Sequence, residues 1–158
     1  MGSPQRANGR CTSIVSSMIK TIIGKILSEA AKQSKKCPPA TQDVSLNLRN
    51  RQKAIKKYGY GPADPFAPKG ENKDFWEEKM EMWGVEKQSQ LKRMVCGTCA
   101  AFDTTDFMKS CISKGLDDSS TDNYDTVEAG ELGYCHMFKF KCASARTCDA
   151  WVSDKSKS

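Results

Sequence analysis

The first third of the chain has the hydrophobic pattern of one amphipathic helix. Between residues 12 and 35, apolar side chains recur as adjacent pairs every four residues, which places them in one stripe along a helix. Pro38 and Pro39 end any helix there, because proline lacks a backbone N–H and disfavours helical geometry in the residue before it. We therefore expect residues 1–40 to form a helical arm whose stripe needs a partner. The stripe consists of Ile14, Val15, Met18, Ile19, Ile22, Ile23, Ile26 and Leu27.

Residues 41–93 have the pattern of a helical region interrupted by a loop rich in Gly and Pro. The segment "TQDVSLNLRNRQKAIKKYGYGP" predicts a helix that is capped at Thr41 and ends near Tyr58 and Gly59, since glycine suits the position after a helix. We expect its apolar residues, Val44, Leu48 and Ile55, to face inward.

Two further helices are expected in the same region. "NKDFWEEKMEMWG" spaces its aromatic residues as on one helix face and ends at Gly84, and "VEKQSQLKRMV" predicts a third helix over 85–95. No segment shows a strong two-residue alternation, so we expect no strong strand.

Charge is unevenly distributed along the chain. Residues 1–58 hold 12 Lys or Arg and 2 Asp or Glu, a net of 12 − 2 = +10, and the remainder holds 13 basic and 17 acidic residues, a net of 13 − 17 = −4. Such asymmetry favours contact of the first third with an acidic surface, and DNA is one candidate. The alternative is a solvated basic face. No stretch of about 18 apolar residues is present, so we expect no membrane span.

The candidate chemistry lies in residues 94–158, which hold six of the eight cysteines. Three interpretations compete. A disulfide framework is typical of secreted chains, but the N-terminus does not have the pattern of a secretory signal. A structural zinc site usually combines Cys-x-x-Cys with a second close pair of ligands. The later cysteines, Cys135, Cys142 and Cys148, are instead seven and six positions apart. An iron–sulfur cluster needs four thiolates and a shell that excludes water. The aromatic residues that would supply that shell are Phe102, Tyr134, Phe138, Phe140 and Trp151.

Three segments resemble the ligand motifs of high-potential iron–sulfur proteins. "CGTCAAF" is similar to their first ligand pair, "CHMFKFK" to their third-ligand segment and "RTCDAW" to their last. The resemblance implies a [4Fe–4S] cluster held by Cys96, Cys99, Cys135 and Cys148, with zinc as the alternative metal. His136 is expected to be a surface neighbour of Cys135, not a ligand.

The block from "TQDVSLNLRNRQKAIKKYGYGPADP" to "CDAWV" also resembles a type of tailed-phage protein. This resemblance implies a virion-associated structural protein, made in the host cytoplasm, whose arm contacts other virion proteins. The contact would use Ile14, Met18, Ile19, Ile22, Ile23 and Ile26.

Together these features predict a mainly α fold with an extended N-terminal helical arm and an irregular C-terminal module pinned by a metal cluster. The expected parts are residues 1–40, 41–93 and 94–158. We expect a structural component of a phage virion and no enzyme, because no phosphate-binding loop or Ser–His pair is present. The alternatives are a soluble electron-transfer protein and a zinc-binding adaptor.

The four remaining cysteines are expected to form no bridge within the chain. Cys111 and Cys142 are predicted to be free thiols. Cys11 and Cys37 flank the arm, and a helix over residues 12–35 would hold them about 36 Å apart at 1.5 Å per residue. We expect each of these two to be free or bonded to a neighbouring subunit.

Overall fold

The computed structural model describes residues 21–22, 24–26, 36–62, 71–116 and 123–157. The chain divides into two units, Met1–Lys36 and Cys37–Ser158. In the first unit, residues 21–22 and 24–26 are helical, and Ile22 and Ile26 are exposed. The other residues of the predicted arm up to position 35, with Cys11, lie outside the described residues.

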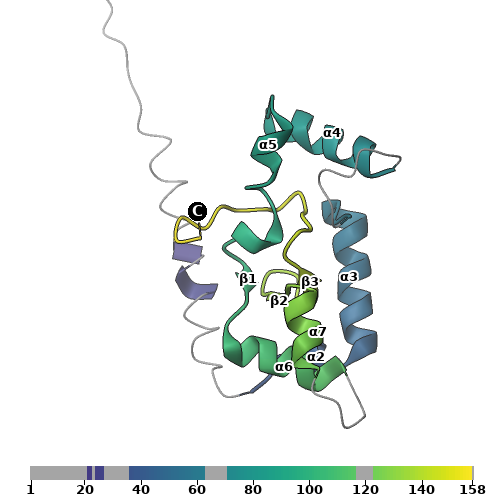
Figure 1. Ribbon diagram of the computed structural model, residues 1–158, viewed down its shortest axis with the longest axis vertical. Helices are drawn as coiled ribbons and strands as arrows, with labels where there is room; N and C mark the ends of the chain where they lie inside the picture. Colours follow the sequence, from purple (N-terminus) through teal and green to yellow (C-terminus); the bar gives the residue numbers. More distant parts are fainter. Residues whose placement is uncertain (1–20, 23, 27–35, 63–70, 117–122, 158) are drawn as a thin grey trace, which may run out of the picture. The chain divides into compact units, whose positions relative to one another are not determined.

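The second unit combines helices with a small three-stranded sheet (Figure 1). The mainly α class is therefore confirmed, and the sheet is a feature that the pattern did not predict. The elements in chain order are α2 (Pro39–Gln42), α3 (Val44–Tyr58), α4 (Glu71–Trp83), α5 (Gln88–Leu91), the 3₁₀ helix η1 (Cys96–Thr98), β1 (Phe102–Asp103), α6 (Asp106–Leu116), α7 (Tyr124–Ala129), β2 (Leu132–Cys135) and β3 (Phe140–Ala143).

Helix α3 ends where the sequence predicts but begins later. Its cap is Asp43, whose carboxylate accepts from the backbone N–H of Leu46 at 2.9 Å, so the predicted cap at Thr41 is wrong. At the other end, Gly59 has φ 52°, a left-handed conformation that favours glycine.

The predicted inward face of α3 is also wrong. Val44, Leu48 and Ile55 are all exposed, and Ala54 is the buried residue. The reason is that α3 lies along the open edge of β3 and pairs with it through amide side chains. Asn47 accepts from the backbone N–H of Lys141 at 2.7 Å, and Asn50 donates to the carbonyl of Lys139 at 2.7 Å. These bonds satisfy backbone groups that an edge strand would otherwise leave open.

The sheet has the order β1-β2-β3, and both pairs are antiparallel. Cys135 lies opposite Phe102 on one side and Phe140 on the other. The turn between β2 and β3 closes with a 2.7 Å bond from the N–H of Lys139 to the carbonyl of Cys135. β2 is therefore the middle strand of the sheet, and its last residue, Cys135, is paired on both sides.

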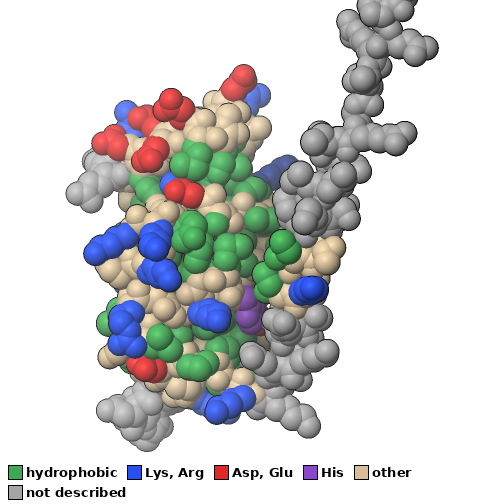
Figure 2. Space-filling model, turned by 180° about the vertical axis from the view of Figure 1, so that it is seen from behind, with side chains coloured by type: hydrophobic (Ala, Val, Ile, Leu, Met, Phe, Trp, Pro, Cys, Tyr) green, Lys and Arg blue, Asp and Glu red, His purple; other side chains and the backbone are tan. Residues whose placement is uncertain are grey.

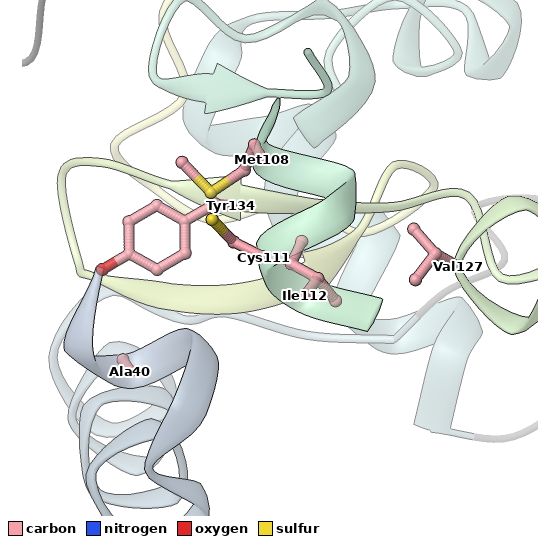
Figure 3. Close-up of a cluster of buried hydrophobic side chains, with 6 residues drawn as sticks. All are labelled: Ala40, Met108, Cys111, Ile112, Val127 and Tyr134. Carbon is pink, nitrogen blue, oxygen red and sulfur yellow. The ribbon is translucent and has the colours of Figure 1, made fainter. Parts of the chain in front are cut away.

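A first hydrophobic cluster lies where α2, α6, α7 and β2 meet (Figure 3). Its buried members are Ala40, Met108, Cys111, Ile112, Val127 and Tyr134. Cys111 forms a disulfide with Cys37, and their Cα atoms are 5.4 Å apart. The predictions that Cys111 is free and that Cys37 is free or bonded to another subunit are therefore wrong. The physical reason is that α2 packs directly on α6, which brings residues 74 positions apart into contact.

The predicted helix "NKDFWEEKMEMWG" is confirmed as α4, and Gly84 follows it with φ 60°. The next predicted helix, over 85–95, is much shorter, because only Gln88–Leu91 is helical as α5. Val95 is already extended, with φ −121° and ψ 166°, and leads the chain into η1. No helix among the described residues has the length and apolarity that crossing a membrane requires.

A candidate thiol-based metal centre

Five cysteines from separate parts of the sequence meet in a second hydrophobic cluster. All five are free thiols, and we call them the thiol site. Cys96 begins η1 and Cys99 follows it, Cys135 ends β2, Cys142 lies in β3, and Cys148 follows β3. The structure thus brings together all four predicted ligands and adds Cys142, which is free as predicted. Their neighbours in the cluster are Ala54, Tyr60, Ala101, Phe102, Phe138, Phe140 and Trp151.

The backbone holds the first cysteine pair against the segment that carries the last cysteine. The N–H of Cys99 donates to the carbonyl of Cys96 at 2.9 Å, which closes the η1 turn. The N–H of Cys96 donates to the carbonyl of Arg146 at 2.6 Å. Cys96 and Cys148 therefore lie on two segments that are hydrogen-bonded to each other.

Cys135 and Cys148 each accept a hydrogen bond from the backbone on the sulfur. The N–H of Phe138 donates to Sγ of Cys135 at 3.5 Å, and the N–H of Ala150 donates to Sγ of Cys148. Burial nevertheless raises the pKa of Cys135 to about 11 and the pKa of Cys148 to about 12, and the neighbouring thiols contribute to the same rise. Without a cation, both sulfurs are therefore protonated at neutral pH.

Cys96 and Cys142 are hydrogen-bonded to each other through their side chains. That bond lowers the pKa of Cys96, and the positive charge of Arg146 acts in the same direction. The bond and burial together raise the pKa of Cys142 well above its ordinary value. Within the pair, Cys96 is therefore the more acidic thiol and Cys142 the less acidic one.

The aromatic shell around the thiol site largely matches the prediction. Phe102, Phe138, Phe140 and Trp151 pack in this cluster, whereas Tyr134 lies in the first cluster instead. Tyr60 was not predicted, and its ring meets Phe140 edge to face with centroids 4.9 Å apart. Burial raises the pKa of Tyr60, as expected for a phenol with an apolar environment.

The last ligand segment is anchored by two residues that follow Cys148. Asp149 forms an ion pair with Lys79, whose side chain is buried, and Lys79 also lies 4.7 Å from the ring centroid of Phe75. Trp151 donates from Nε1 to the carbonyl of Val95 at 3.0 Å. These contacts fix the backbone of Cys148 and its neighbours relative to α4 and η1.

His136 follows Cys135 in the sequence, and its side chain contacts Asp103. Its Nε2 is 2.9 Å from a carboxylate oxygen of Asp103. That carboxylate also accepts from the N–H and the hydroxyl of Thr105.

The donor set is chemically suited to soft metals. Thiolates bind zinc and iron–sulfur clusters, and backbone N–H groups aimed at sulfur tune a cluster's potential. Among the described residues, no three Cys, His, Asp or Glu side chains are arranged to hold a metal ion. A single zinc ion with Zn–S bonds of about 2.3 Å requires its four sulfurs to converge on one point. A cluster of four irons and four sulfides is larger than a single zinc ion, so its four thiolate ligands lie farther apart from one another.

Comparison with known proteins gives no relative for this chain: no protein-family model matches it, and neither a curated protein nor a solved structure shows significant similarity. The resemblance to high-potential iron–sulfur proteins therefore rests on the three cysteine motifs alone.

Sequence reasoning missed Cys142 and Tyr60 as parts of the site. A signal for Cys142 was present in "FKFKC", where Phe138, Phe140 and Cys142 alternate with two lysines. This alternation places the two aromatic rings and the thiol on one face of a strand, as β3 shows for Phe140 and Cys142. Tyr60 has no comparable signal, because only the packing of the α3 end against β3 brings it to the site.

Proposed function

We propose that this protein binds a [4Fe–4S] cluster through Cys96, Cys99, Cys135 and Cys148, and that it is a structural component of a tailed-phage virion. In this proposal the cluster holds together three segments of the second unit, which carry Cys96 with Cys99, Cys135 and Cys148. The arm then contacts other virion proteins.

The observation that carries the proposal is the thiol site itself. Four segments place five free thiols in one apolar, aromatic-lined cluster. Buried polar groups usually have bonding partners. A cation that replaces the protons of these buried thiols would supply such a partner and stabilise the group. Backbone N–H groups aimed at Cys135 and Cys148 would stabilise bound thiolates.

The assembly role is supported by the surface of the chain. Ile22 and Ile26 of the arm are 56% and 48% exposed, which leaves apolar area for another protein. Four basic side chains, Arg49, Lys53, Lys56 and Lys57, are exposed along α3, so an acidic surface such as DNA is a further candidate partner. Acidic side chains instead gather at the α4 end of the unit (Figure 2).

Electron transfer is the second candidate function. Cys96, Cys135 and Cys148 are only partly buried, and a cluster near the surface can exchange electrons with a partner. A reversible redox couple with a soluble donor would favour this function, and salt-resistant co-purification with virions would favour the structural role. A zinc adaptor is the third candidate.

The test is the metal content of the protein purified without oxygen. We expect about four iron and four sulfide per chain, and no stoichiometric zinc. Cys96→Ser, Cys99→Ser, Cys135→Ser and Cys148→Ser should each lose most of the iron. Cys37→Ser is the matched control, because it removes a cysteine outside the thiol site and should retain the iron. Stoichiometric zinc without sulfide would disprove the cluster.

A further inference from the structure

We propose that Cys96 and Cys142 are a reversible disulfide site, oxidised by a small-molecule disulfide when the thiol site carries no metal. The inference deepens the proposed function, because Cys96 is one of the proposed cluster ligands. Cys142 has no role in that function, although it is 3% exposed and lies among the ligands.

The two cysteines are held together by the backbone on both sides. The N–H of Gly97 donates to the carbonyl of Ser144 at 2.9 Å, and the N–H of Cys96 donates to the carbonyl of Arg146 at 2.6 Å. A Cβ atom on residue 97 would lie 3.1 Å from Cβ of Ser144, so glycine permits this close approach of η1 to the end of β3.

The side chains of Cys96 and Cys142 are also in contact with each other. Cys142 lies inside β3, opposite Gly133, and its side chain is hydrogen-bonded to that of Cys96. A hydrogen bond between two thiols places the sulfurs next to each other, and the backbone bonds between residues 96–97 and 144–146 hold the two segments close together, as a disulfide requires. The sulfurs of Cys135 and Cys148 accept hydrogen bonds from backbone N–H groups. The sulfur of Cys96 also accepts from its own N–H, but its main hydrogen bond is the one with Cys142.

The reaction is a thiol–disulfide exchange in two steps, with glutathione disulfide as the oxidant. The thiolate of Cys96 attacks one sulfur of glutathione disulfide and releases one glutathione thiolate. The Cys142 thiol then loses its proton to solvent and attacks Sγ of Cys96, which releases the second glutathione. The protein loses two electrons and two protons, and the glutathione disulfide is reduced to two glutathione molecules.

Cluster binding and the disulfide exclude each other. A sulfur that ligates iron cannot at the same time bridge Cys142, and a bridged Cys96 leaves three of the four proposed ligands. The pair would therefore keep metal-free protein from taking up a cluster until a thiol reductant reopens it.

The experiment maps disulfides after treatment of metal-free and iron-loaded full-length protein with glutathione disulfide. Trypsin places Cys96 with Cys99 in residues 94–109, and Cys142 in residues 142–146. We expect metal-free protein to give these two peptides joined, with loss of two hydrogens, and iron-loaded protein to give them separate. Dithiothreitol should release them.

Variants show whether the bridge to Cys142 is formed by Cys96 or by Cys99. The joined peptide should persist in Cys99→Ser and disappear in Cys96→Ser and in Cys142→Ala. Retained iron in Cys142→Ala would show that this variant folds and that Cys142 is not a ligand. A bridge that persists in Cys96→Ser, or iron lost from Cys142→Ala while Cys37→Ser keeps it, would overturn the inference. A joined peptide from protein that never binds iron would refute the cluster and leave the disulfide site standing.

Discussion

At the scale of single residues, the contact between Asp103 and His136 is the clearest source of pH dependence. Burial opposes ionisation of Asp103, but hydrogen bonds from His136 and Thr105 outweigh it and lower the pKa to about 2 from 3.8. A carboxyl group with a lowered pKa stabilises the folded state above its unfolded pKa. That contribution is lost as the pH falls through the folded value.

We therefore predict that Asp103→Asn weakens the acid-induced loss of stability between about pH 4 and pH 2. The variant should also lower the free energy of unfolding at neutral pH by about 1–2 kcal/mol, because it removes a charged hydrogen-bond acceptor from a partly exposed site. The measurement is urea unfolding of the wild type and the variant at several pH values.

The control for this experiment is Asp74→Asn, which alters an exposed carboxylate on α4. We expect its unfolding free energy to follow that of the wild type within about 0.5 kcal/mol. Equal pH profiles for Asp103→Asn and the wild type would show that the Asp103 contact does not stabilise the fold.

At the scale of elements, the contact of α2 with α6 depends on one glycine. A Cβ atom on residue 115 would lie 1.6 Å from the carbonyl oxygen of Thr41, which is a backbone atom and cannot rotate away. The same contact includes a 2.7 Å bond from the side-chain amide of Gln42 to the carbonyl of Cys111. The two helices therefore approach closely only because position 115 lacks a side chain.

We predict that Gly115→Ala destabilises the protein by about 1–3 kcal/mol, as overpacking of a close contact does. Lys114→Ala is the matched control, because it changes the neighbouring exposed position on α6. Thermal unfolding of both variants measures the difference. A Gly115→Ala variant as stable as its control would show that α2 and α6 do not approach as described.

Among the elements, the ends of helices could be predicted from the sequence, whereas the face that a helix buries could not. Helices α3 and α4 follow from local signals, since Gly59 and Gly84 end them with left-handed backbone conformations. The orientation of α3 does not follow from such signals. Its apolar residues suggest an inward face, but Asn47 and Asn50 pair with the edge of β3, and Leu48 remains 52% exposed.

The candidate site was predictable as a set of residues but not as an arrangement. Local motifs identified four of the five thiols, and most of the aromatic neighbours follow from their nearness in sequence. The pairing of Cys37 with Cys111 has no local signal, because it depends on the packing of α2 against α6. The fifth thiol depends on the register of β3, in which Cys142 lies opposite Gly133.

At the scale of the whole molecule, the disulfide ties the first residue of the second unit to α6. It closes a loop of 74 positions, and a bridge of that span restricts the unfolded chain strongly. We predict that Cys37→Ser lowers the free energy of unfolding by about 2–4 kcal/mol. Urea unfolding with and without a reductant measures this, and the wild type should lose a similar amount when reduced.

Two observations distinguish the stabilising role of the Cys37–Cys111 disulfide from the metal-binding role proposed for the thiol site. Trypsin should give residues 37–49 joined to residues 110–114 from unreduced protein. Cys37→Ser should be insensitive to the reductant in the same unfolding assay. Free thiols at both Cys37 and Cys111 in native protein would show that the bridge does not form.

The assembly proposal predicts a separation between folding and association, because the arm and the second unit are distinct units of the chain. Ile22→Asp combined with Ile26→Asp places two charges on the exposed apolar stripe. We expect this variant to keep the unfolding midpoint and iron content of the wild type but to lose incorporation into particles. Co-sedimentation with virions after a high-salt wash measures incorporation.

The matched control is Ser17→Asp combined with Thr21→Asp, which adds the same charge on the polar side of the predicted helix. It should be incorporated like the wild type if apolar contact drives docking. If both variants instead lose incorporation to the same extent, and wild-type binding falls steeply with salt, charge is the cause and nucleic acid is the better partner. If the Ile22 and Ile26 variant is incorporated normally, the stripe is not an interface, and the exposed face of α3 becomes the next surface to test.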